Sequence, residues 1–150
     1  SLPAYGLYMR HAKNIQLENI YLQIKEPDAR PAILADDCHN VSIDGLYADR
    51  SQFEQPVIRL VQSTNITISK YNAVHPVAVF VKVEGERSSG IKLIGNDLSK
   101  VDKPVVVSDG SKKSAVKKIA NFQKQTVVVN ASKMQESICR FAGAYQFIFC

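Results

Sequence analysis

The sequence repeats with a period of about 25 residues, and this repeat limits the possible folds more than any other feature. Four segments share the pattern Asn or Gly, apolar, polar, apolar, at residues 14–17, 40–43, 65–68 and 90–93. A weaker fifth copy begins at Ala115, although its fourth position is polar. Alternating apolar positions indicate strands, and Asn and Gly are the residues that most readily adopt a left-handed bend. The pattern therefore predicts a bend followed by a strand in every repeat.

A second strand is predicted before each bend, because apolar residues recur there in register as well. Leu7, Ile33 and Ile58 would form one inward column, and Met9, Ala35 and Leu60 the column two residues further on. None of these segments has the three- and four-residue spacing that a helical solenoid needs. The sequence therefore predicts an all-β fold, a parallel β-helix of about six coils, in which each coil forms hydrogen bonds with the next.

The length of 150 residues suits one domain with one continuous core. We expect residues 1–110 to form the regular coils. Residues 111–150 are expected to form a less regular, basic C-terminal tail or cap of the same domain. The apolar residues of this tail that would cover an end of the coils are Phe122, Phe141, Tyr145, Phe147 and Phe149.

The net charge of +5 comes from the C-terminal third of the chain. Residues 1–99 carry 10 basic and 11 acidic side chains, whereas residues 100–150 carry 9 and 3. The lysines at 112, 113, 117 and 118 lie beside Ser and Ala rather than aromatic residues, so we predict a solvated basic edge and no nucleic-acid partner. No apolar run reaches the length of a membrane span, and no membrane partner is expected.

The three cysteines, Cys38, Cys139 and Cys150, are far apart and lack paired spacing. They predict neither a disulfide framework nor a zinc site. The sequence also has no glycine-rich phosphate loop, no zinc-protease helix and no nucleophile elbow. We therefore expect no cofactor and no metal.

Candidate site residues emerge when the coils are aligned on the bends. Arg10 and Asp36 fall in one column, and His11 and Asp37 fall in the next. One interpretation is a polar site with paired carboxylates, as glycosidases require; the other is a surface ladder of opposite charges. The second is favoured because nothing in the sequence places a water molecule or a leaving group between the carboxylates. Arg30, beside Asp28, is a candidate contact for a sugar acid, or else a clamp within its own loop.

Two stretches, residues 2–11 and 28–37, resemble the C-terminal coils of glycoside hydrolase family 28, the polygalacturonase-like enzymes. The shared features are a run of the form Pro-x-x-Gly-(aromatic or Leu)-x-x-Arg-His, followed by Asp-x-Arg-Pro-Ala, and the resemblance extends over about residues 2–75. It implies a right-handed parallel β-helix, secretion or export to the periplasm, and no metal requirement. It also implies inverting hydrolysis of galacturonan-type polysaccharide by Asp residues.

The chain departs from that family in its catalytic strings. The family carries Asn-Thr-Asp, a later Asp-Asp, Gly-His-Gly and Arg-Ile-Lys, and three of these four are absent here. The pair Asp36 and Asp37 belongs to the Arg-Pro-Ala stretch that follows the catalytic coils, so no catalytic residue is carried over. We expect the C-terminal β-helix portion of a pectin-degrading hydrolase, partnered by upstream coils of a longer chain. The alternative is a non-catalytic β-helix module that binds carbohydrate or protein.

Overall fold

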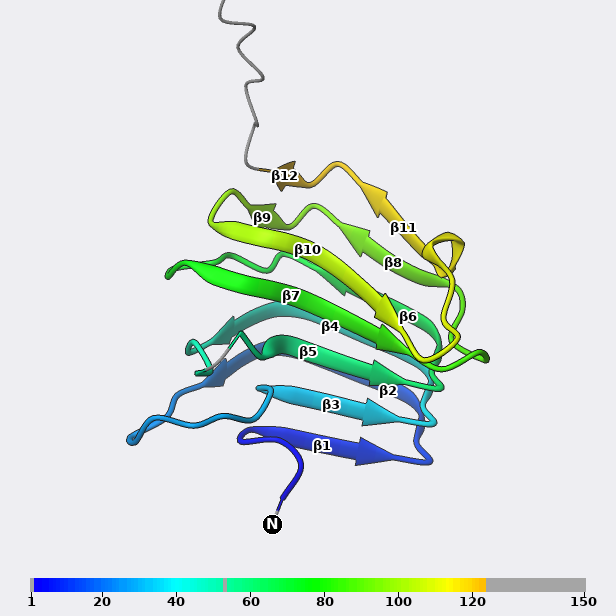
Figure 1. Ribbon diagram of the computed structural model, residues 1–150, viewed down its shortest axis with the longest axis horizontal. Helices are drawn as coiled ribbons and strands as arrows, with labels where there is room; N and C mark the ends of the chain where they lie inside the picture. Colours follow the sequence, from blue (N-terminus) through cyan, green and yellow to red (C-terminus); the bar gives the residue numbers. More distant parts are fainter. Residues whose placement is uncertain (1, 53, 124–150) are drawn as a thin grey trace, which may run out of the picture.

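The computed structural model describes residues 2–52 and 54–123 and shows an all-β solenoid with parallel strands (Figure 1). The strands of the first sheet, called sheet A, are β1 (Leu7–Arg10), β3 (Ile33–Asp36), β5 (Pro56–Val61), β7 (Val77–Glu84) and β10 (Val101–Ser108). Sheet B contains β2 (Lys13–Leu22), β4 (His39–Ala48), β6 (Thr64–Ser69), β8 (Ile91–Ile94) and β11 (Val116–Ile119). A short third sheet pairs β9 (Asp97–Leu98) with β12 (Phe122–Gln123).

Every strand pairs in parallel with the equivalent strand one coil away, which confirms the predicted β-helix. The register joins Leu7 to Ile33 and Ile33 to Ile58, as the first inward column requires. Met9, Ala35 and Leu60 are joined in the same way. The described residues form five coils, where the chain length divided by the period predicted about six; residues 124–150 lie outside the described part.

The bends between sheet A and sheet B have the predicted left-handed conformation. Asn14, Asn40, Asn65 and Gly90 have φ of 59°, 55°, 55° and 65°. The asparagines also form a ladder, because Asn40 Nδ2 donates to Asn14 Oδ1 at 2.8 Å and Asn65 Nδ2 donates to Asn40 Oδ1 at 3.1 Å. The bend is therefore stabilised both by residue type and by contacts between coils.

A second ladder of bends, which the sequence analysis missed, turns the chain at the far end of sheet B. It consists of Asn19, Gly45, Lys70, Gly95 and Ala120, all with positive φ between 50° and 76°. Gly95 separates β8 from β9, and Ala120 separates β11 from β12. A further set of left-handed residues, His11, Asp37, Gln62 and Gly85, directly follows the strands of sheet A. The variable loops lie between the bends after sheet B and the next strand of sheet A.

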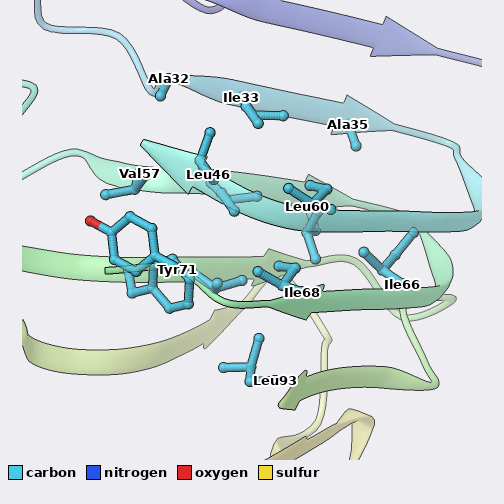
Figure 2. Packing of buried hydrophobic residues seen from close by; sticks show 14 of the residues in the cluster. Ala32, Ile33, Ala35, Leu46, Val57, Leu60, Ile66, Ile68, Tyr71 and Leu93 are labelled. Atoms are coloured by element: carbon cyan, nitrogen blue, oxygen red, sulfur yellow. The ribbon is translucent and has the colours of Figure 1, made fainter. Parts of the chain in front are cut away.

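The core lies between the sheets, where the inward columns meet. Figure 2 shows Ile33, Leu60, Ile68 and Leu93 pointing into this space from both sheets, and none of the four is exposed to solvent. At the loop side the core continues through Tyr71, whose ring stacks on Phe80 with centroids 4.2 Å apart. Cys38 is buried with a free thiol; Cys139 and Cys150 lie outside the described residues.

The two outermost described coils differ in the side chains that occupy their inward-facing positions and in how well these are buried. In the first coil, the inward residues Ile15, Leu17, Ile20 and Leu22 are only half-buried, whereas their partners on β4 are buried or half-buried. In the last described coil, Lys118 pairs in register with the inward Leu93 and is exposed. The boundary expected at residue 110 falls inside this coil, since strand pairing continues to Gln123. Of the residues expected to cap the coils, Phe122 lies in β12 and is 75% exposed, whereas Phe141, Tyr145, Phe147 and Phe149 lie outside the described residues.

Candidate functional site

The structure brings together four of the five predicted site residues at the corner after β1 and β3. Arg10 Nε lies 3.2 Å from Asp36 Oδ2, one coil away. His11 Nδ1 lies 2.8 Å from Asp37 Oδ2. Arg87, which the sequence analysis did not select, adds a third cation with its Nη2 atom 3.3 Å from Asp37 Oδ1. Both carboxylates are therefore engaged by basic side chains.

The electrostatics of this corner favour a charge ladder over an acid catalyst. The hydrogen bond from His11, with the positive charges of Arg87 and Arg10, holds the pKa of Asp37 below its ordinary value. A general acid in a glycosidase needs a raised pKa instead.

Arg30 does not belong to this corner, because it lies before β3 while Asp36 and Asp37 lie at the other end of that strand. Its Nε and Nη2 atoms bind the two oxygens of Asp28 at 2.9 and 2.5 Å. Nη1 also donates to the backbone carbonyl of Leu2 at 3.1 Å. Arg30 thus clamps its own loop to the N-terminal segment, with about a third of its side chain exposed.

A different cluster, on the outer face of sheet A, has stronger features of a binding site. Arg59 on β5 donates from Nε and Nη2 to the two carboxylate oxygens of Glu84 on β7, and the second of these bonds measures 3.1 Å. Lys82 Nζ lies 3.0 Å from Glu84 Oε1. The Glu84 side chain is 5% exposed, whereas those of Arg59 and Lys82 are 41% and 32% exposed. A buried anion thus holds two cations that still reach solvent.

Burial works to raise the pKa of Glu84, but the hydrogen bonds from Arg59 and Lys82 outweigh it and leave the pKa below its ordinary value. The Glu84 pair also raises the pKa of Arg59 further above its already high value. Glu84 and Arg59 therefore remain ionised at neutral pH.

Arg59 and Lys82 line a depression of about 350 Å³ that we call the cationic groove. Its residues are Glu54, Gln55, Pro56, Arg59, Val79, Lys82, Lys103 and Val106. At Glu54 and Gln55 it adjoins a larger hollow of about 730 Å³ between the loops that precede sheet A. The volume of the groove is within the usual range for ligand sites.

The candidate residues chosen from the sequence do not include this cluster, and the place of Lys82 in it is concealed because the repeat length changes between coils. In sheet B, Ile68 pairs with Leu93 at the full repeat length. In sheet A, however, the partner of Arg59 is Lys82, two positions before the residue that a full repeat would reach. A uniform repeat places Arg59 and Glu84 in one column, but it sets Lys82 two positions away from the partner of Arg59. The shorter repeat in sheet A, next to Pro76, was the sequence signal for the pairing of Arg59 with Lys82.

Among the described residues, no group of three or more His, Cys, Asp or Glu side chains is arranged to hold a metal ion. Within the same part of the chain, no helix is long and apolar enough to cross a membrane. No family model, curated protein or solved structure matches this chain.

Proposed function

We propose that this chain is the C-terminal β-helix part of a polygalacturonase-like glycoside hydrolase that acts on pectin-type polysaccharide. Support comes from the parallel solenoid, in which equivalent strands pair from coil to coil, combined with the resemblance at residues 2–11 and 28–37. In this proposal the enzyme is secreted or periplasmic. Upstream coils of the longer chain carry the catalytic pair, and this part supplies scaffold and substrate contacts.

The assignment of catalysis to the upstream coils rests on how Asp36 and Asp37 are bound in this structure. Both carboxylates are engaged by Arg10, His11 and Arg87, which is the arrangement of an ion-pair ladder between coils. The half-buried inward residues of the first coil fit the same proposal, since a preceding coil would complete their burial.

The test uses the full-length product of the natural reading frame and, separately, the 150-residue chain, each incubated with polygalacturonate. We expect the full-length protein to release reducing ends with inverted anomeric configuration, read by NMR, and the shorter chain to release none. Hydrolysis by the shorter chain alone would contradict the division of labour. A full-length protein that cleaves no galacturonan would contradict the hydrolase proposal.

A second candidate function is a non-catalytic β-helix module that binds carbohydrate, and the cationic groove is the observation that favours it. The distinguishing measurement is the mass of the native protein in its source. A species several times larger than 16.6 kDa supports the hydrolase. A species of that mass that binds polysaccharide without cleaving it supports the module.

A further inference from the structure

We infer that the cationic groove binds the carboxylate groups of an acidic oligosaccharide lying across β5, β7 and β10. The choice of galacturonate as the acidic sugar rests on the proposed function. The assignment of the groove rests on its own residues, which belong to none of the stretches that carry the family resemblance.

The first argument is that the cations of the groove are held in place before any ligand arrives. Glu84 uses its two oxygens to fix Arg59 and Lys82. The guanidinium has five N–H donors, of which Glu84 occupies two, and the ammonium has three, of which it occupies one. Both cations therefore keep donors for an incoming carboxylate, and their partial burial strengthens such a contact.

The second argument concerns the position of Lys103, which lines the groove from β10 and is exposed. Arg59, Lys82 and Lys103 come from three neighbouring strands, and neighbouring strands are about 4.8 Å apart. Arg59 faces Lys82, whereas Lys103 faces Val79, so the third positive charge is offset by three residues, about 10 Å, along the strand direction. This arrangement suits a chain that carries several carboxylates better than it suits a single small anion.

The third argument is the mixed character of the lining. Pro56 and Val79 are buried residues of the floor, and Glu54 and Gln55 bring a carboxylate and an amide to the rim. A sugar ring has both an apolar face and hydroxyl groups. The apolar floor suits the ring face, and the polar rim suits the hydroxyl groups. The adjoining hollow of about 730 Å³ leaves room for the chain to continue beyond the groove.

The experiment measures binding of trigalacturonate to the 150-residue chain by calorimetry, with the methyl-esterified trisaccharide as the uncharged match. Lys103→Gln removes one exposed cation from the groove. Lys92→Gln removes an exposed cation from β8 of sheet B and serves as the matched control. Thermal unfolding of each variant checks that the fold is retained.

We expect Lys103→Gln to weaken trigalacturonate binding about tenfold, Lys92→Gln to leave it unchanged, and the methyl ester to bind much more weakly than the acid. Equal binding of ester and acid would overturn the inference, and so would equal losses in the two variants. Displacement by acetate at the concentration of the trisaccharide would show a site for simple anions and would also overturn it.

Failure of this inference can be distinguished from failure of the proposed function. If the full-length protein cleaves galacturonan but the groove variants bind normally, only the groove assignment is lost. If the groove binds trigalacturonate as expected and the full-length protein cleaves nothing, the hydrolase is lost and the binding module remains.

Discussion

The guanidinium of Arg59 on β5 binds the carboxylate of Glu84 on β7, although the two residues are not opposite each other in the register. Arg59 faces Lys82, and Glu84 faces Val61. Like charges directly opposite on adjacent strands are destabilising. Glu84, two residues beyond Lys82 on the same face, offsets this repulsion by contacting both cations. One buried carboxylate therefore makes an otherwise unfavourable pairing compatible with the fold.

Replacing Glu84 with Gln should lower the free energy of unfolding at neutral pH. We expect a loss of about 2 kcal/mol, less than for a fully buried ion pair, because Arg59 and Lys82 are partly exposed and can be hydrated. Urea unfolding measures the change. Glu86→Gln, which alters an exposed acid near the end of β7, is the control, and an equal loss in both variants would contradict the prediction.

The same pair makes stability depend on pH in a defined direction. The folded pKa of Glu84 is below the ordinary value of 4.5, so its contribution is fully present above about pH 4.5 and is lost as the pH falls through the folded pKa. The wild-type chain should therefore lose more stability than Glu84→Gln between pH 5 and pH 3, as measured by urea unfolding at each pH. Parallel pH curves for the two proteins would show that the pair makes no such contribution.

Asn40 in the first ladder of bends combines a left-handed backbone with hydrogen bonds to both neighbouring coils. Asn40→Gly keeps the backbone freedom and removes only the hydrogen bonds, whereas Asn40→Ala also incurs a left-handed strain of about 1–2 kcal/mol. We expect the Ala variant to unfold at the lower temperature of the two. If the two variants melt together, the bend conformation is not what Asn40 contributes.

Gly45 in the second ladder of bends has φ of 76°, and a Cβ atom there would lie 2.9 Å from Asn19 Oδ1. Gly95 has φ of 61°, and its Cβ would meet nothing within 4 Å. Gly45→Ala should therefore be more destabilising than Gly95→Ala, by up to about 1 kcal/mol, because only the first adds crowding to backbone strain. Thermal unfolding compares them, and a Gly95 variant that is the less stable would refute the explanation.

Asp36→Asn and Asp37→Asn test whether the corner cluster performs chemistry. In the full-length hydrolase that we propose, we expect kcat on polygalacturonate to change by less than about threefold, whereas loss of a catalytic acid or base costs about 10²–10⁴-fold. The reason is that both carboxylates are engaged by basic side chains and the pKa of Asp37 is lowered. A collapse of kcat in either variant, with unchanged thermal stability, would assign that residue to catalysis.

The sequence alone determined the solenoid and its first corner. Leu7, Ile33 and Ile58 alternate with polar residues, and Asn14, Asn40 and Asn65 stand where the backbone turns left-handed. Both signals are local, because strand alternation and left-handed preference depend on residue type and spacing within one coil. The second corner was harder to see, since Lys70 and Ala120 are not residues that favour such a bend.

Only the tertiary structure decided which charged side chains meet on the outer face. Arg10 and Asp36 were predictable because the first two coils keep a regular register. A uniform repeat also places Arg59 and Glu84 in one column, but the pairing of Arg59 with Lys82 was not predictable, because the repeat in sheet A becomes shorter between β5 and β7 while sheet B keeps its full length. The loops between the sheets compensate for the difference in repeat length. A shift of two residues keeps the inward-facing residues inward, because side chains alternate with a period of two, but it changes every cross-strand neighbour on the outer face.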